Sequence, residues 1–337
     1  MRIVDVFCGC GGLSLGLQNA GFEVVASFDN WDKAVEIYNE NFDHTCFLHD
    51  LSDRDKTVNL VQPFSPDMIV GGPPCQDFSS AGKRDITLGR ADLTYDYAHL
   101  VTMIRPKWFI MENVDRIKAS HILHEIIEDF KNAGYGLTSV ILDASYCNTP
   151  QARKRFFLIG ELGGKHNVLL PYLKEKLESR PMTVKDYLGD SLEVTHYYRH
   201  PRNYSRRGIF SINEPSPTVR GVNRPLPKTY VLNSCDGDDI DLTKVRPLTT
   251  IERSYIQTFP KDFIFKGTKT NLEQMIGNAV PVNLANFVGK AIQRYLKDKT
   301  ENRFIPSPDQ EFKLCDSVLK NQTESIKKVK KSQLEFF

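Results

Sequence analysis

The 337-residue sequence has no long hydrophobic run. A membrane-spanning helix needs roughly 18 or more consecutive apolar residues, and residues 1–12 break into glycines before the apolar core of a signal peptide could form. Gly and Pro occur 21 and 18 times and 26% of residues are charged, which excludes collagen-like and wholly disordered classes. We therefore expect a globular protein that stays in the cytoplasm.

The sequence also lacks paired cysteines. Its seven cysteines are irregularly spaced, with one C-x-C at Cys8 and Cys10 and no C-x-x-C. An odd number at irregular spacing in a chain of this length favours free thiols in a reducing compartment over a disulfide framework. Because no paired cluster of cysteine and histidine occurs either, we expect no metal site.

The chain has little net charge, but the charge is unevenly distributed. Forty-four basic and 42 acidic residues give +2, and the pI of about 8.1 is low for a nucleic-acid-binding protein. Residues 196–228 nevertheless hold seven cations against the single acid Glu214. The cations are Arg199, Arg202, Arg206, Arg207, Arg220, Arg224 and Lys228. With its tyrosines and prolines, this basic segment suits loops that meet phosphates and bases, although a solvated basic loop has the same composition.

Strand-like and helix-like runs alternate along the first half of the chain. β-Branched and aromatic runs predict strands at residues 3–7, 24–28, 67–70, 108–111, 140–143 and 156–160. Amphipathic stretches predict helices at residues 13–20, 33–41, 95–104 and 122–133. Strands that alternate with helices imply right-handed crossovers. We predict an α/β fold with a Rossmann-like, doubly wound, mostly parallel sheet.

The periodicity weakens after about residue 163, where Pro, Arg, Asn and Gly increase. This change predicts a second, smaller and irregular domain. We place the first domain at residues 1–182, the second at 183–277, a helix that returns to the first domain at 278–297, and a tail at 298–337.

A glycine-rich turn, C-G-C-G-G at residues 8–12, follows the first predicted strand. Glycines let a turn pass close to a ligand, and the free N–H groups of a helix start attract an anion. Asp29 ends the next predicted strand, where an acid can hold the hydroxyls of a ribose. The pair indicates an adenosine-bearing cofactor, although a purely structural turn would have the same pattern. Ser14 replaces the third glycine of a dinucleotide fingerprint, which disfavours a nicotinamide dehydrogenase.

Three further motifs lie at predicted strand ends. In G-G-P-P-C-Q (residues 71–76) a rigid turn places Cys75 at the edge of the sheet, where a thiolate could be a nucleophile; a buried filler thiol would not need that turn. Glu112, in M-E-N-V, could deliver a proton to a ring nitrogen or cap the next helix. Arg153 and Arg155, two apart in Q-A-R-K-R, could grip carbonyl oxygens and phosphates or lie at a surface edge.

The order of these motifs resembles that of the cytosine-C5 DNA methyltransferases of bacterial restriction–modification systems. The resemblance covers about residues 1–165 and 246–292. It rests on D-V-F-C-G-C-G-G, G-G-P-P-C-Q-D-F-S, E-N-V, Q-A-R-K-R, R-P-L-T-T-I-E-R with Q-T-F-P, and G-N-A-V-P.

The resemblance implies a methyltransferase fold with a catalytic domain and a target-recognition domain, and S-adenosylmethionine as cofactor. The implied cofactor residues are Phe7, Cys8, Gly9, Gly11, Gly12, Asp29, Asn30, Asp50, Leu93 and Asn278. A flipped-out cytosine would be attacked at C6 by Cys75 while Glu112 protonates N3. Arg155 would hold the cytosine O2 with Arg153 as its helper, and the product would be 5-methylcytosine.

The resemblance also implies double-stranded DNA as the substrate. The loop at residues 78–93 would close over the flipped base, but it reads R-A-D-L at residues 90–93 where the family often has Arg-Gly followed shortly by Leu. The DNA contacts we expect are Ser79, Lys83, Arg84, Arg90, Arg206, Arg207, Thr218, Arg220 and Arg224. We expect a monomer whose cognate restriction endonuclease belongs to the same system without direct contact.

Two other functions remain open. A branch of the family methylates cytosine in tRNA, but it tends to carry a Cys-Phe-Thr triplet that is absent here. A catalytically silent binding module would keep the fold and lose Cys75, Glu112 or Asn278, all of which are present.

Overall fold

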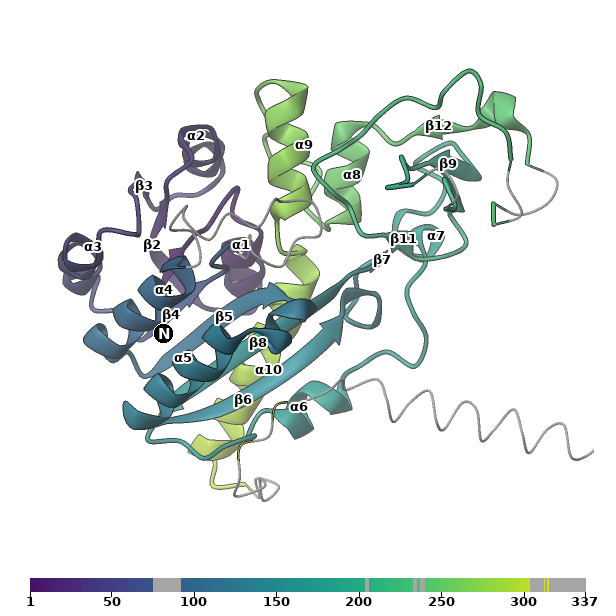
Figure 1. Cartoon of the computed structure of the whole chain (residues 1–337). Helices are drawn as coiled ribbons and strands as arrows, with labels where there is room; N and C mark the ends of the chain where they lie inside the picture. The colour runs from purple at the N-terminus through teal and green to yellow at the C-terminus, as the bar shows by residue number, and fades with distance from the viewer. Residues whose placement is uncertain are drawn as a thin grey trace, which may run out of the picture.

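The computed structural model describes residues 1–74, 92–203, 206–232, 235–236, 240–303, 312 and 314. Its centre is a seven-stranded sheet with the strand order β3-β2-β1-β4-β5-β8-β6 (Figure 1). The strands are β1 (Arg2–Val6), β2 (Glu23–Asp29), β3 (Cys46–Leu48), β4 (Met68–Gly71), β5 (Trp108–Val114), β6 (Tyr135–Asp143) and β8 (Lys154–Leu162). Neighbouring strands are parallel except β8, which is antiparallel to both β5 and β6. The predicted doubly wound, mostly parallel sheet is confirmed.

Helices cover both faces of this sheet, as Figure 1 shows for α4 and α5 on one face and α10 on the other. Those of the first half are α1 (Gly12–Asn19), α2 (Asp32–Asn41), α3 (Arg54–Val61), α4 (Asp92–Ile104), α5 (His121–Asn132) and α6 (Leu170–Glu175). Alternate residues of β5 divide between two cores: Trp108 and Ile110 pack with α10, and Phe109 and Met111 pack with α4 and α5. This alternation is the expected consequence of strand geometry in a three-layer fold.

The second half of the chain is less regular. A short sheet has the order β10-β9-β12, and β11 pairs with β7. The strands are β7 (Gln151–Ala152), β9 (His196–Tyr198), β10 (Ile209–Ser211), β11 (Ser216–Pro217) and β12 (Arg246–Pro247). The helices are α7 (Val184–Leu188), α8 (Thr250–Ile256), α9 (Lys269–Asn278) and α10 (Val282–Thr300). The predicted loss of regularity is present, while the domain boundaries drawn from the sequence remain predictions.

Within the first 150 residues, the sequence patterns did not predict one strand, β3, and one α-helix, α3. β3 has three residues, of which Phe47 and Leu48 are exposed at the edge of the sheet, so it lacks the buried alternation that marks a strand. α3 buries only Thr57 and Val61, so its apolar face is narrow. Among the described helices, none has the length and apolar character to cross a membrane.

Candidate active site

A cavity of about 860 Å³ lies where the strands β1, β2, β4 and β5 end. Parallel strands deliver their carboxyl ends to one rim, which is where α/β proteins bind ligands. The predicted site residues that line it are Phe7, Cys8, Gly9, Gly12, Asp29, Asn30, Asp50, Leu93, Glu112, Arg153, Arg155 and Asn278. The fold therefore brings these residues to one space; of the other predicted cofactor and catalytic residues, Gly11 does not line the cavity and Cys75 lies outside the described residues.

The turn between β1 and α1 forms one wall of the cavity. Asp29 accepts hydrogen bonds from the backbone N–H of Gly9 at 2.8 Å and of Trp31 at 2.9 Å, which fixes its carboxyl against the turn. Burial raises the pKa of this carboxyl, although the N–H donors act in the opposite direction. Gly11, the residue before α1, has no side chain to cap the helix, and the Ser14 N–H of the first turn faces the Asp5 carboxyl. The positive end of the helix dipole favours an anion at this end of α1.

Two glycines of this turn, Gly9 and Gly11, have different structural roles. Both have positive φ, at 55° for Gly9 and 93° for Gly11, a conformation that favours glycine. A Cβ at Gly9 would meet nothing within 4 Å, whereas one at Gly11 would overlap the Phe42 ring. Gly9 therefore leaves open space beside the cavity, and Gly11, which does not line the cavity, is needed for packing against α2 and Phe42.

A buried polar network supports the turn from below. Asp5 of β1 accepts a hydrogen bond from Ser14 of α1 at 2.6 Å, and the Tyr38 hydroxyl donates to Ser14 at 2.6 Å. Asp5 is fully buried, and desolvation raises the pKa of its carboxyl to about 7. Since Asp5 belongs to β1 and Ser14 to α1, their hydrogen bond holds together the strand and the helix that the turn connects.

The opposite wall carries Glu112, near the end of β5. The Arg155 Nε lies 2.9 Å from a Glu112 carboxylate oxygen, and both side chains are largely buried. Burial raises the pKa of Glu112, against the opposing charges of Arg155 and Arg153. A Cβ at Gly72 would lie 3.0 Å from the other carboxylate oxygen, so a glycine leaves room for that group. The site holds a carboxyl that can donate or accept a proton beside a fixed cation.

Asn113 ties the end of β5 to the G-G-P-P turn. Its side-chain amide donates to the Pro73 carbonyl at 3.0 Å, and its amide oxygen accepts from the backbone N–H of Val114 at 2.8 Å. The described part of this turn stops at Pro74, so Cys75 lies outside the described residues. Four predicted DNA contacts also lie outside them, namely Ser79, Lys83, Arg84 and Arg90.

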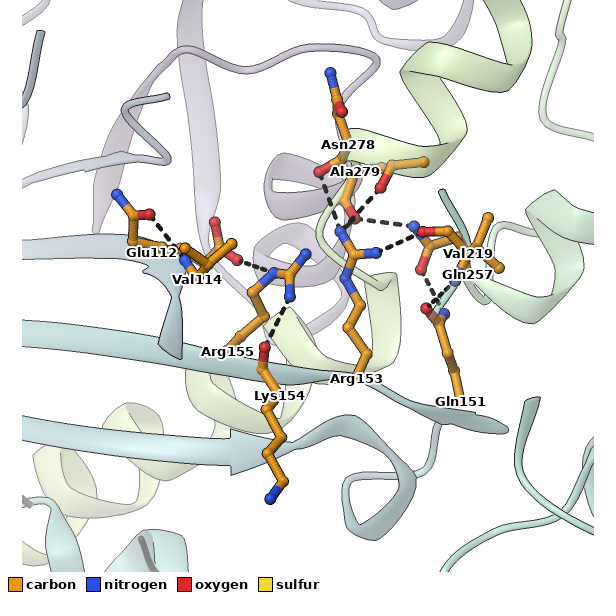
Figure 2. A network of polar contacts seen from close by, with 12 residues as sticks. Glu112, Val114, Gln151, Arg153, Lys154, Arg155, Val219, Gln257, Asn278 and Ala279 are labelled. Carbon is orange, nitrogen blue, oxygen red and sulfur yellow. Dashed lines mark hydrogen bonds and ion pairs between the residues drawn. The ribbon is translucent and has the colours of Figure 1, made fainter. Parts of the chain in front are cut away.

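Arg153 and Arg155 leave the chain on the same side, as the sequence predicts, but their guanidinium groups meet different partners (Figure 2). Arg155 pairs with Glu112. Arg153 is 1% exposed and donates to four main-chain carbonyls, those of Val219, Gly277, Asn278 and Ala279, at 3.0–3.4 Å. It grips carbonyl oxygens of its own chain at the wall of the cavity.

The basic segment, residues 196–228, uses some of its cations internally. Arg207 forms a bidentate pair with Glu214 and lies 4.5 Å from the centre of the Phe210 ring. Arg199 donates to the Thr218 carbonyl at 3.0 Å, and Arg220 donates to the His200 carbonyl. The Thr218 hydroxyl donates to the Ala152 carbonyl at 3.0 Å.

The exposed cations of this segment are different residues. Arg202, Arg206, Arg224 and Lys228 are exposed at the surface, and Arg202 also interacts within the protein. Among the predicted DNA contacts that fall within the described residues, Arg206 and Arg224 are therefore the ones that face solvent.

Several cavity-lining residues were not predicted. They include Trp31, Ser52, Gln274, Met275 and Val280. Trp31 lies two residues after Asp29, and an aromatic residue close to the acid that we predict to hold a ribose is a signal that the sequence carries. Gln274 and Met275 come from the helix α9, whose approach to the cavity no local pattern indicates.

The residues of the first wall fit an adenosine-bearing cofactor. The cavity volume lies within the roughly 300–1,000 Å³ typical of small-molecule sites. Open space beside Gly9, an uncapped helix start and a carboxyl at the end of β2 match an anionic group followed by a ribose.

Comparison with known proteins identifies the family. The family model described as C-5 cytosine-specific DNA methylase matches residues 1–294. The Type II methyltransferase M.HindV of Haemophilus influenzae is 66% identical over 298 residues, covering 88% of this chain and 98% of its own. M.HgiDI of Herpetosiphon aurantiacus is 54% identical over 296 residues, covering 88% of this chain and 95% of its own.

The crystal structure of the Dnmt2 methyltransferase of S. pombe is similar to this one with a TM-score of 0.65. It is 18% identical and covers 89% of this chain and 99% of that chain, which confirms the predicted methyltransferase fold. The family match and the two close relatives together confirm the resemblance drawn from the motifs. The chain belongs to the C-5 cytosine-specific DNA methylase family and is a DNA methyltransferase.

Proposed function

We propose that this enzyme transfers the methyl group of S-adenosylmethionine to C5 of a flipped-out cytosine within a short specific sequence of double-stranded DNA. The observation that carries this proposal is the buried pair of Glu112 and Arg155, on the wall opposite Asp29 in a single cavity. The proposal is also supported by two relatives of this protein, M.HindV and M.HgiDI, which are named type II methyltransferases. Protection of DNA in a type II restriction–modification system, as a cytoplasmic monomer, is the role we propose.

The cofactor side of the cavity would hold S-adenosylmethionine. Asp29 is placed to accept hydrogen bonds from the ribose hydroxyls, and the uncapped start of α1 to bind the carboxylate. Among the residues that line the cavity, Phe7, Trp31 and Leu93 would supply apolar surface, and Asn30, Asp50 and Asn278 would supply polar groups. The bound cofactor supplies an electrophilic methyl group.

The base side of the cavity would activate the cytosine. The ring must leave the duplex, since C5 and C6 cannot be reached within the stack. The Cys75 thiolate would add to C6 while Glu112 donates a proton to N3, so that C5 becomes nucleophilic. Arg155 holds the Glu112 carboxyl in place and would donate to the cytosine O2. After methylation, N3 would return its proton to Glu112, C5 would lose its proton to a base, and the bond between sulfur and C6 would break, releasing 5-methylcytosine and the Cys75 thiolate.

The first experiment is a measurement of labelled methyl transfer from S-adenosylmethionine to a mixed-sequence DNA duplex and, in parallel, to tRNA. Bisulfite sequencing of the DNA product locates the modified base. We expect label at C5 of cytosine within one recurrent short sequence, and none in tRNA. Label in tRNA alone would move the enzyme to an RNA substrate, and no label in either would leave a binding protein without methyltransferase activity.

A further inference from the structure

The C-terminal end of the helix α9 is capped by two buried side chains from other parts of the chain. An α-helix leaves its last four carbonyl groups without partners inside the helix. Here the Gln257 amide donates to the carbonyls of Ile276 at 2.5 Å and Ala279 at 3.0 Å. Arg153 Nη2 donates to the carbonyls of Gly277, Asn278 and Ala279. All four consecutive carbonyls, 276–279, are thus satisfied by side chains.

Arg153 binds a third segment as well. Its Nη1 donates to the Val219 carbonyl at 3.0 Å, and the neighbouring Gln151 accepts from the Val219 N–H at 2.9 Å. Gln151 also donates to the Gln257 side chain at 2.7 Å (Figure 2). Four segments of the chain are therefore joined at one point: the end of β7, the chain around Val219, Gln257 after α8, and the end of α9.

The charge of Arg153 suits this position. The guanidinium is buried and lies against carbonyl oxygens at a helix C-terminus, where the helix dipole is negative and favours a cation. A neutral donor would satisfy the carbonyls without that electrostatic gain. A lysine would keep the charge, but a single ammonium group cannot match a planar fork that donates in two directions.

The two segments joined by Arg153 face different parts of the proposed reaction. Gln274, Met275, Gly277 and Asn278 at the end of α9 line the cavity. Val219 lies in the basic segment, next to Thr218 and Arg220. These two segments of the chain are in close contact, since a Cβ at Gly277 would overlap the backbone nitrogen of Gly221.

We propose that Arg153 is a positioning residue that fixes the α9 end of the cavity against the chain around Val219, and that it does not contact the base. The proposal rests on the proposed function, because it assigns α9 to the cofactor side and the basic segment to the DNA side. It differs from the sequence expectation that Arg153 helps Arg155 at the cytosine. The two roles predict different kinetic consequences.

The test is Arg153→Lys, with binding of S-adenosylhomocysteine measured by titration calorimetry and methyl transfer measured over a range of DNA concentrations. Loss of buried hydrogen bonds at the cavity wall should raise the Kd of S-adenosylhomocysteine about tenfold and raise the KM for DNA. The kcat at saturation of both substrates should fall by less than about threefold, because the reacting groups stay in place. An unchanged Kd with a large fall in kcat would assign Arg153 to the base and overturn the proposal.

Two further variants keep the test decisive. Gln257→Glu removes the amide N–H groups that cap the end of α9, and Gln257 does not line the cavity. The same rise in the Kd of S-adenosylhomocysteine is therefore expected from this variant, which replaces Arg153→Lys in the test if that variant fails to fold. Arg294→Lys is the matched control, because Arg294 also donates to a main-chain carbonyl, that of Tyr172, away from the cavity. It should lower the Tm without changing the Kd.

If Arg294→Lys raises the Kd of S-adenosylhomocysteine as much as Arg153→Lys does, Arg153 has only a general structural role and the proposal is wrong. Wild-type enzyme that neither binds S-adenosylhomocysteine nor methylates DNA would defeat the proposed function, a result distinct from either outcome of the variants.

Discussion

The cavity and the basic segment (residues 196–228) use polar side chains in different ways. Around the cavity, the ends of regular strands place Asp29 and Glu112, and both carboxyls line the cavity although backbone N–H groups hold Asp29 and Arg155 holds Glu112. In the basic segment the chain is irregular, and Arg199, Arg207 and Arg220 bind carbonyls or a carboxylate of the protein itself. An irregular chain has many backbone groups without partners, so its cations are first used to satisfy the fold.

Among the variants that test this difference, Glu112→Gln should have the largest effect on methyl transfer. The amide keeps the shape but cannot donate a carboxylic proton, so the single-turnover rate of methyl transfer should fall about 10²- to 10⁴-fold. DNA affinity should remain within about threefold, since the DNA contacts lie elsewhere. Cys75→Ser provides the reference for complete loss of transfer. A Glu112→Gln enzyme that keeps its rate would show that the carboxyl is structural.

The buried network of Asp5, Ser14 and Tyr38 should make the free energy of unfolding depend on pH. The pKa of Asp5 is raised from 3.8 to about 7 in the fold. Its contribution to stability is therefore fully present below the unfolded pKa and is lost as pH rises through about 7. The free energy of unfolding should fall between pH 4 and 7 by up to about 1.4 kcal/mol per unit relative to Asp5→Asn.

Urea denaturation of the wild type and of Asp5→Asn at several pH values measures this difference. Asparagine keeps an acceptor for Ser14 and has no ionisable proton, which makes the variant its own control for packing. If the two curves run parallel from pH 4 to 7, Asp5 does not titrate in that range.

The two glycines of the first turn should separate ligand binding from stability. Gly11→Ala meets Phe42 and Tyr38 and should lower the free energy of unfolding by about 1–3 kcal/mol. Gly9→Ala has room for its methyl group, so it should cost only about 1 kcal/mol for the positive φ. The same methyl group points into open space beside the cavity and should weaken binding of S-adenosylhomocysteine. Equal losses of stability in both variants would contradict the distinction.

The smallest effects should separate two adjacent arginines of the basic segment. Arg206 is exposed, so Arg206→Ser should reduce the slope of log K for DNA against log salt by about one. Arg207 is paired with Glu214, so Arg207→Ser should lower the Tm and leave the slope nearly unchanged. Binding titrations from low to moderate salt test both. A slope that responds to Arg207 alone would place the phosphate contacts on the internally paired residue.

The same contrast explains how far the sequence alone predicts the site. Strand ends are local features, and in a parallel sheet they share one rim, so the sequence suffices to place Asp29 and Glu112 beside one cavity. Pairing in the basic segment depends on how loops turn: Arg207 meets Glu214 only because β10 lies between them and the chain folds back. Residues 274–275 reach the cavity through the packing of α9, which leaves no periodic signal.

The arrangement of the cavity walls has a consequence for synthesis of the protein on the ribosome. Phe7, which follows β1, and the strands that carry Asp29 and Glu112 are synthesised first, but the wall formed by the end of α9 is supplied by residues 274–280. Chains are made at about 5–20 residues per second, so the interval from the end of β5 to the end of α9 lasts about 8–30 seconds. We expect that throughout that interval the cavity lacks the wall from α9, and that the chain does not act on DNA until most of it has been translated.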